Sequence, residues 1–286
     1  MAIGSSTLDK RGGTRAKTPD SGGSSTGQVQ SLTRGLMLLE RIAESVSGVS
    51  LTDLALQVGL PNSTTHRLLT TMQQAGFVQQ VGDLGLWTIG VRAFTVGSAF
   101  LDSRELITIA HPIMRRLVDA AGETANLTVL DREEGLAVLI GQVECREMMR
   151  MLAPIGNRMP LHASGAGKAF IATLSDDEVN EVLRKTGLVQ YTHSTINTPA
   201  KLKEEIARIR RQGFSFDDEE HAIGLRCVAA CIYNEYNEPF AAISVSGPKS
   251  RIPDERVVHL GSLVVQAAQD ITQAFSGISR PGYPKR

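Results

Sequence analysis

The sequence predicts an α+β protein with an N-terminal winged helix-turn-helix domain and a larger C-terminal domain of strands and helices. Two patterns lead to this expectation: residues 29–89 follow the order helix, helix, turn, helix, hairpin, and apolar-polar alternation predicts strands from residue 124 onwards. The length of 286 residues, 42% of them hydrophobic, suits two separate cores better than one.

The composition limits the class of protein. Lys plus Arg and Asp plus Glu both number 30, so the net charge is zero and bulk charge gives no sign of nucleic acid binding. No apolar signal core follows Met1, and the densest apolar stretch, residues 136–143, is far too short to span a bilayer. The three cysteines, an odd number, argue against a secreted disulfide framework. We therefore expect a cytoplasmic protein without membrane contact.

Residues 1–27 are expected to form a mobile N-terminal arm, because they contain too few large apolar side chains to offset the entropy of ordering. A solvated tail is the simple interpretation. The alternative is that its cations contact DNA phosphates or the minor groove; these are Lys10, Arg11, Arg15 and Lys17. Residues 277–286 are expected to form a C-terminal tail.

The first helix is predicted from Val29 by an apolar stripe at helical spacing. The stripe consists of Leu32, Leu36, Leu39 and Ala43, widened by Leu38 and Ile42. A capping box from Ser50 to Asp53 opens the second helix, and Gly59 ends it. The third helix runs from Asn62 to about Ala75.

The third helix has two unlike faces, as a helix-turn-helix requires. Its apolar side carries Leu68, Leu69, Met72 and Ala75. The residues expected to meet DNA are Ser63, Thr64, His66, Arg67, Thr70 and Gln74. Strand-like runs at 77–81 and 86–89, joined by a tight turn at Gly82-Asp83, are expected to form a hairpin wing. The wing completes a winged helix-turn-helix domain over residues 28–92. The alternative is an ordinary small α+β domain with a polar surface.

This N-terminal domain does not carry a basic patch. In residues 28–90 the cations are Arg34, Arg41 and Arg67, against the acids Glu40, Glu44, Asp53 and Asp83. Each neutralised phosphate contributes roughly −0.9 to the slope of the logarithm of DNA affinity against the logarithm of salt concentration. Because few phosphates can be neutralised here, we expect weak non-specific DNA binding. Affinity should come from helix N-termini, hydroxyl contacts and symmetry. If Arg67 reads a guanine, its replacement by alanine costs about 1–3 kcal/mol per half-site; the alternative is a phosphate contact without base choice.

Residues 93–121 are predicted to be linker helices with a break near Pro112. Their apolar residues would be left uncovered on a thin connector; these are Phe94, Val96, Phe100, Leu106 and Ile109. In residues 122–276, strands are expected at 124–130, 136–143, 147–152, 227–233 and 239–246. Helices are expected at 163–174, 176–185 (opened by a Ser175–Glu178 capping box), 200–212 and 254–274.

A small-molecule pocket is predicted in this second domain. Ser244 and Ser246 alternate with Ile243 and Val245, so both hydroxyls lie on one face of their strand. A hairpin turning near Tyr236 sets Cys227 beside them, within one residue of register. Residues 164–167 begin a helix, where free N–H groups favour an anion, but the full phosphate-loop pattern is absent. A small carboxylate suits the pocket better than a nucleotide.

Six stretches of the chain closely resemble the IclR family of bacterial transcription regulators. They are residues 27–35, 60–69, 151–156, 162–168, 216–221 and 243–247, and the likeness extends from Gly27 to about Ser276. The resemblance implies a GAF-like effector-binding domain and a repressor of the glyoxylate-bypass operon that binds double-stranded operator DNA. It also implies homodimers joined through the DNA-binding and linker regions, and tetramers joined through the effector domains. Glyoxylate and pyruvate would be opposing effectors, with no further cofactor.

The resemblance places ligand contacts on Gly165, Ala166, Asp217, Cys227, Ser244 and Ser246, with apolar neighbours Met148, Met151, Met159 and Leu225. In this hypothesis backbone N–H groups and serine hydroxyls hold a carboxylate. Asp217 accepts a hydrogen bond from the other end of the ligand, since an ionised Asp217 would repel the carboxylate. The plain alternative is that Ser246 and Cys227 are small core residues.

The sequence allows three other functional interpretations. The chain could regulate another catabolic operon through a different small carboxylate. Cys227, His221 and Asp217 could be taken for a thiol-hydrolase triad, but no nucleophile elbow surrounds the cysteine, so no enzyme is expected. His221, Cys227 and Cys231 do not have a usual zinc spacing, and the two cysteines lie roughly 13 Å apart along a strand. A metal sensor using these three residues is therefore kept only as a minor alternative, and Cys145 and Cys231 are expected to be buried apolar residues.

Overall fold

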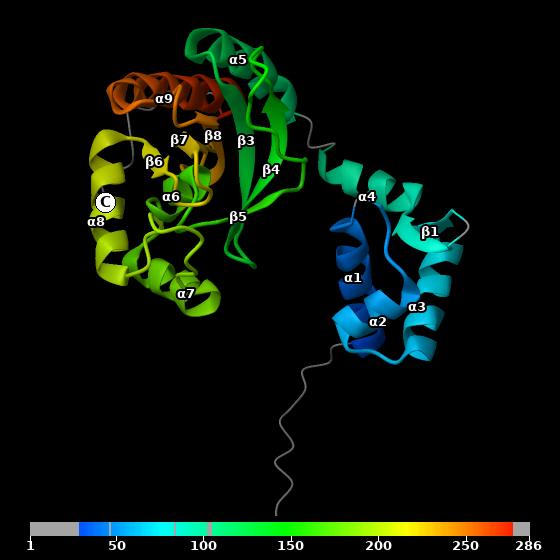
Figure 1. The fold of residues 1–286 in the computed structure, drawn as a ribbon. Coiled ribbons are helices and arrows are strands. Elements are labelled where there is room, and N and C mark those ends of the chain that lie inside the picture. Colours follow the sequence, from blue (N-terminus) through cyan, green and yellow to red (C-terminus); the bar gives the residue numbers. More distant parts are fainter. Residues whose placement is uncertain (1–28, 46, 83, 102–104, 277–286) are drawn as a thin grey trace, which may run out of the picture. The chain divides into compact units, whose positions relative to one another are not determined.

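The computed structural model of the chain describes residues 29–45, 47–82, 84–101 and 105–276 (Figure 1). The expected arm at 1–27, the expected tail at 277–286 and Asp83 of the wing turn lie outside the described residues. Contacts divide the chain into two compact units, residues 1–97 and 98–286, each with its own core.

The N-terminal unit has the predicted element order. It contains α1 (Gln30–Ala43), α2 (Leu51–Val58), α3 (Asn62–Gln74), β1 (Val78–Val81) and β2 (Leu86–Ile89), and α4 (Val91–Leu101) begins in it. Ser50 caps α2 by accepting a hydrogen bond from the Asp53 N–H at 3.1 Å, and Gly59 ends α2 with a φ of 68°, as predicted. The β1–β2 hairpin is antiparallel and forms the wing.

The core of this unit lies between the three helices and the wing. It consists of Leu38, Ile42, Leu54, Leu69, Val78 and Trp87. The predicted stripe on α1 was wrong in part, since Leu32 is 62% exposed and Leu36 52% exposed. The buried face of α1 instead passes through Gly35, Leu38 and Ile42. Spacing alone allowed both faces, and the contacts with α2 and α3 selected this one.

The C-terminal unit is a sheet between two helical layers. Its helices are α5 (Glu105–Ala121), α6 (Gly165–Ile171), α7 (Asp176–Thr186), α8 (Pro199–Gln212) and α9 (Asp254–Ser276). Its strands are β3 (Thr124–Asp131), β4 (Leu136–Val143), β5 (Arg158–Pro160), β6 (Ser215–Asp218), β7 (Leu225–Tyr233) and β8 (Pro239–Pro248). Among the described residues the sheet order is β5-β4-β3-β8-β7-β6, with each neighbouring pair antiparallel.

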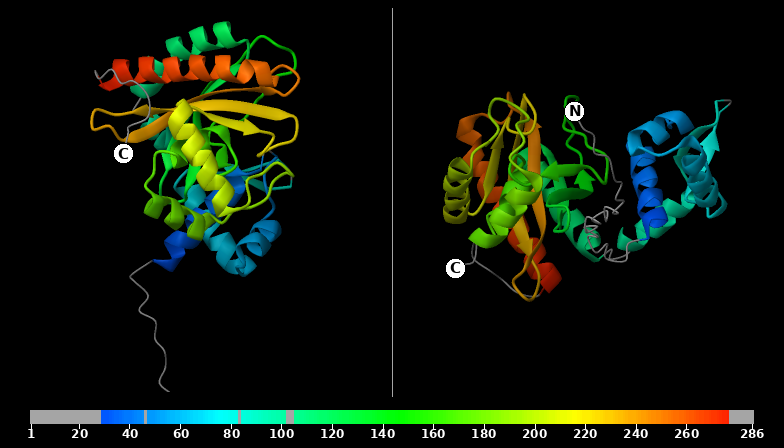
Figure 2. Two further views of the ribbon diagram at one scale, coloured as in Figure 1. Left: turned by 90° about the vertical axis from the view of Figure 1, so that its left-hand side faces the viewer. Right: turned by 90° about the horizontal axis from the view of Figure 1, so that it is seen from below.

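Helices α5 and α9 cover one face of the sheet, and α6, α7 and α8 lie on the other (Figures 1 and 2). Strand alternation assigns side chains to these two sides. Leu127, Ile243 and Val245 belong to the core under α5 and α9, whereas Ala229 and Ala242 belong to the core beside α6 and α8. The mixed helix and sheet architecture confirms the predicted α+β class, while the GAF-like description stays a prediction.

Two local predictions in this unit were wrong. Pro112 does not break the helix but lies inside α5, because apolar residues after it pack against the sheet and α9 and offset one lost hydrogen bond. No strand forms at residues 147–152. The edge of β4 is taken instead by residues 156–160, which include the unpredicted strand β5.

The second unpredicted strand is β6. Two of its four residues are acidic, a composition with low strand propensity, and pairing with β7 and burial against α6 stabilise it. The helix α5, expected in a linker, packs on the sheet and α9 of the C-terminal unit. None of the described helices combines the length and the apolar character needed to cross a membrane.

Candidate functional site

The polar face of α3 is open to solvent within its unit. Ser63, His66, Arg67 and Gln74 are exposed, and Thr64 and Thr70 are partly exposed. The opposite face packs inward through Leu69, which is fully buried, with Leu68 and Met72 partly buried beside it. The predicted division of the helix is therefore present, with one face in the core and one free to contact a ligand, but Ala75, expected on the apolar side, is exposed.

The N-terminus of α3 adds backbone donors to this face. Pro61 precedes the helix, and within the described part of the chain no side chain caps it. Thr65 turns inward, where its hydroxyl donates to the Pro61 carbonyl at 3.2 Å. The first N–H groups of α3 are thus available to an anion such as a DNA phosphate, which suits a domain with few cations.

A second candidate site is a cavity at the middle of the C-terminal sheet, on the α6 side. It is lined by Asn126, Thr128, Leu139, Met151, Ala153, Asn157, Met159, Ser164, Gly165, Ala166, Asp217, His221, Leu225, Cys227, Ser244 and Ser246. Its free volume is about 40 Å³, room for about three water-sized groups. The cavity therefore suits a molecule of very few heavy atoms.

Nine of the ten predicted effector residues line this cavity, and Met148 does not. Met148 is 98% exposed, because the loop that carries it does not form the strand expected there. Sequence reasoning missed Asn126, Thr128 and Asn157 as lining residues. Alternation along 124–130 could have placed Asn126 and Thr128 on the pocket face, opposite Leu127.

The sheet register brings the polar residues into two neighbouring rows. Asp217 of β6 pairs with Cys227 of β7, and Cys227 pairs with Ser246 of β8. Ser244 of β8 pairs with Asn126 of β3. The predicted neighbourhood of Cys227 and the two serines is confirmed, with Cys227 directly opposite Ser246.

Helix α6 approaches Cys227 of β7 closely because Gly165 has no side chain. A Cβ at position 165 would lie 2.6 Å from the Cys227 Sγ, closer than real atoms approach. Ser164 caps α6, accepting from the Gly167 N–H at 3.1 Å, and its own hydroxyl donates to the Pro160 carbonyl at 2.7 Å. Any larger residue at 165 would push α6 away from the sheet and change the cavity.

Asp217 is the acid of the cavity and is almost completely buried, with 2% of its surface exposed. Burial raises the pKa of Asp217 to about 7, and the nearby Glu220 carboxylate acts in the same direction. Its Oδ1 accepts a hydrogen bond from the Glu220 N–H at 2.7 Å. Near pH 7 a large fraction of the protein molecules therefore carries a protonated, neutral Asp217, which reduces the repulsion between this side chain and a bound carboxylate.

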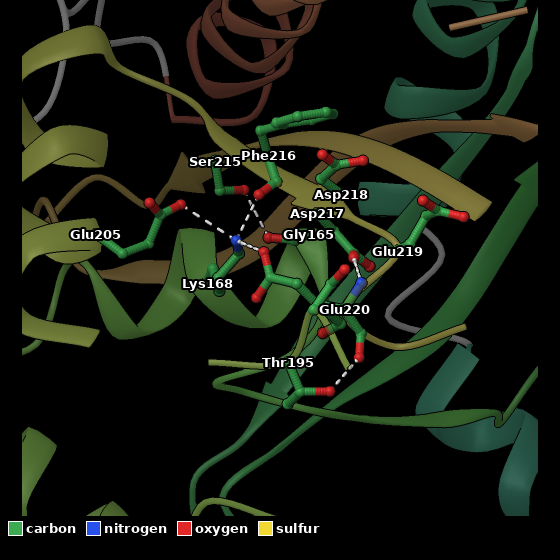
Figure 3. Close-up of polar contacts among 12 residues, drawn as sticks. Gly165, Lys168, Thr195, Glu205, Ser215, Phe216, Asp217, Asp218, Glu219 and Glu220 are labelled. Carbon is green, nitrogen blue, oxygen red and sulfur yellow. Dashed lines mark hydrogen bonds and ion pairs between the residues drawn. The ribbon is translucent and has the colours of Figure 1, made fainter. Parts of the chain in front are cut away.

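Lys168 of α6 holds the loop that follows Asp217 against this helix (Figure 3). Its fully buried ammonium donates to the Glu205 carboxylate at 3.1 Å, to the Glu220 carboxylate and to the Phe216 carbonyl. Burial opposes ionisation of Glu205, but Lys168 and Arg208 outweigh it and lower the pKa of Glu205. Burial raises the pKa of Glu220. This network was not predicted, because its members are 37 and 52 residues apart in sequence.

Two threonine hydroxyls also stabilise the loop that follows Asp217. The Thr192 hydroxyl donates to the Glu219 carbonyl at 2.6 Å, and the Thr195 hydroxyl donates to the Glu220 carbonyl at 2.7 Å. Glu219 has a φ of 60°, which is uncommon for a residue other than glycine. These contacts hold the loop in a conformation that Glu219 would not favour by itself.

The enzyme alternative finds no support in this geometry. Burial raises the pKa of the Cys227 thiol to about 11, so the sulfur is not a thiolate nucleophile at neutral pH. Burial lowers the pKa of His221. Among the described residues, no group of three His, Cys, Asp or Glu side chains has an arrangement that could hold a metal ion, and Cys231 lies in the apolar core beside α8.

Two surface grooves are larger than this cavity. One of about 320 Å³ lies between α7 and α8, and one of about 250 Å³ lies between α7 and the β3–β4 turn. Both are lined by charged side chains of surface helices together with apolar residues. The smaller cavity differs from these grooves in that its polar side chains are buried, among them Asp217, Ser244 and Ser246.

Comparisons with known proteins cover both units. Residues 31–82 match the IclR helix-turn-helix domain, and residues 98–273 match the C-terminal domain of bacterial transcriptional regulators of the IclR type. The chain is 61% identical over 252 residues to the acetate operon repressor of Salmonella typhimurium (strain LT2), covering 88% of this chain and 92% of that protein. It is also 61% identical over 253 residues to the transcriptional repressor IclR of Escherichia coli (strain K12), with the same coverage.

A solved structure agrees with this likeness. A transcriptional regulator from Rhodococcus sp. RHA1 is 29% identical, with a TM-score of 0.72, covering 87% of this chain and 98% of that one. The relatives are transcriptional repressors, which confirms the prediction that the chain is not an enzyme. This chain belongs to the IclR family of bacterial transcriptional regulators.

Proposed function

We propose that this protein represses the acetate, or glyoxylate-bypass, operon in the cytoplasm, and that a small oxo-acid in the C-terminal cavity controls its affinity for operator DNA. The observation that carries the DNA half is the exposed polar face of α3 beside an uncapped helix N-terminus. The choice of operon follows from 61% identity to repressors whose names state that target or that family.

For the effector we propose glyoxylate and pyruvate. Their few heavy atoms suit a cavity of about 40 Å³. The hydroxyls of Ser244 and Ser246 and the N–H groups of Gly165 and Ala166 are the donors for the carboxylate. Asp217, on β6 and two strands away from the serines of β8, is the partner for a hydroxyl of the hydrated carbonyl. Met151, Met159 and Leu225 supply the apolar wall.

We further propose that the protein acts as a homodimer that assembles into tetramers. Large apolar side chains are exposed on α1 and α4, and a second copy of the chain would cover them. They are Leu32, Leu36, Phe94 and Val96. A ligand shifts such an equilibrium only if it binds the two assemblies with different affinity. In this proposal glyoxylate favours the dimer and weakens repression, and pyruvate has the opposite effect.

The test of the DNA half is Arg67→Ala on α3. Removal of a guanidinium that reads a base or a phosphate should lower operator affinity by about 10–100-fold per half-site, the equivalent of roughly 1–3 kcal/mol. The measurement is a gel-shift titration with the acetate operon promoter. Arg41→Ala is the matched control, because Arg41 is exposed on α1 and pairs with Glu44 at 2.9 Å. Unchanged affinity of Arg67→Ala, or an equal loss in the control, would reject the assignment.

A further inference from the structure

We infer that Gln142 and Asn126 are positioning residues that set whether Ser246 offers the cavity a hydrogen-bond donor or an acceptor. The inference rests on the proposed function, in which an oxo-acid occupies the cavity. It concerns the specificity of that site: the two amides would decide how strongly it selects a carboxylate over a neutral ligand of the same shape.

The contacts form a chain across three strands. The Gln142 Nε2 of β4 donates to the Asn126 Oδ1 of β3 at 2.7 Å. The Asn126 Nδ2 donates to the Ser246 Oγ of β8 at 3.1 Å. Gln142 and Asn126 are direct neighbours in the β3–β4 register. The chain therefore leads from the partly exposed β4 to a hydroxyl in the cavity wall.

The donor and acceptor roles along this chain depend on one another. An amide presents an oxygen that only accepts and a nitrogen that only donates. Because Asn126 donates to the Ser246 oxygen, the Ser246 proton is free to point toward the Cys227 sulfur or a ligand in the cavity. Asn126 is 7% exposed and Ser246 6% exposed, so water has little access to replace either contact.

The opposite arrangement is reached by rotating both amides by half a turn. Asn126 then presents its oxygen to Ser246, the hydroxyl donates to that oxygen, and only lone pairs face the cavity. A carboxylate requires donors, so it is bound in the first arrangement and repelled in the second. A carboxamide, which has donors of its own, tolerates the second.

Gln142→Glu fixes the unfavourable arrangement. A carboxylate at position 142 only accepts, so Asn126 must turn its nitrogen to it and its oxygen to Ser246. Gln142 is partly exposed, so the charge there is compatible with folding. The new charge also repels an anion directly, and the same substitution in a Ser246→Ala background measures this part separately.

The experiment is calorimetric titration of the full-length protein with pyruvate and with its neutral amide, pyruvamide. Four proteins are compared: wild type, Gln142→Glu, Ser246→Ala and the double variant. Gln142→Glu should weaken pyruvate binding by about tenfold or more, the equivalent of one hydrogen bond to a charged group. It should weaken pyruvamide binding by less than about threefold, and its effect on pyruvate should fall to about threefold in the Ser246→Ala background.

Equal losses for the acid and the amide, or an equal effect of Gln142→Glu with and without the Ser246 hydroxyl, would overturn the inference while leaving the proposed function intact. If the wild-type protein binds no small oxo-acid, the effector half of the proposed function fails, and the inference fails with it. Gln142→Met is the second variant should the glutamate impair folding. Without the donor to Asn126, it should still lower pyruvate affinity by about threefold, and only when Ser246 is present.

Discussion

Replacement of Lys168 by methionine is expected to destabilise the C-terminal unit by about 3–5 kcal/mol. The side chain of Lys168 is fully buried between the carboxylates of Glu205 and Glu220. Methionine fills the space of the aliphatic chain but leaves Glu220 without a cation. Removing one member of a buried ion pair leaves an uncompensated charge, which is the costly part of the change. Thermal unfolding should show a midpoint lower by roughly 10 °C.

A double variant distinguishes charge from packing. Adding Glu220→Gln to Lys168→Met removes the unpaired carboxylate and should restore part of the lost stability, whereas Glu205 keeps its pair with Arg208 at 2.7 Å. Lys201→Met, an exposed position on α8, is the matched control and should leave the midpoint nearly unchanged. If Lys168→Met unfolds at the wild-type midpoint, the network does not hold the loop in place.

The second large effect is expected in the pH dependence of stability. Burial raises the pKa of Asp217 from 3.8 to about 7, so the folded protein keeps a proton that the unfolded chain releases at lower pH. The stabilisation from this carboxyl is complete below about pH 4, declines from there, and is lost once the pH has risen through about 7. The difference between the two limits is roughly 4 kcal/mol.

Asp217→Asn removes this contribution while keeping the size of the side chain. Relative to wild type, the variant should gain stability at about pH 8 and lose that advantage at about pH 4. Denaturant unfolding at both pH values measures the difference, which isolates Asp217 from the titration of Glu220 and His221. Glu235→Gln, exposed in the turn between β7 and β8, is the control. The same pH dependence in Asp217→Asn and wild type would show that this carboxyl does not retain its proton.

Local signals predicted much of the fold and of the two sites. Ser50 and Gly59 bound the second helix, because capping and a left-handed backbone are properties of single residues. The alternation of Ser244 and Ser246 with Ile243 and Val245 placed the hydroxyls on the cavity face, because the period of a strand is fixed. The polar face of α3 was predicted for the same reason, from the period of a helix.

The features that were missed depend on contacts distant in sequence. Lys168 resembles any cation at the end of a glycine-rich turn, and only folding brings Glu205 and Glu220 to it. The strand β6 forms because β7 offers a partner, and β5 takes the edge of β4 that residues 147–152 were expected to use. Gln142 and Asn126 share a register that spacing alone does not give. Met148 was expected to line the pocket, but it is exposed because its loop does not form the strand expected at residues 147–152.

The most direct test of the central claim is the operator affinity of the full-length protein as glyoxylate is added, measured by fluorescence anisotropy on the acetate operon promoter. The Ser244→Ala/Ser246→Ala double variant is titrated in parallel. We expect glyoxylate to lower the affinity of the wild-type protein by about 5–150-fold, the range of a typical coupling between two sites. The double variant should bind the operator normally and not respond. An operator affinity that is insensitive to saturating glyoxylate in wild type, or an equal response in the double variant, would contradict the account.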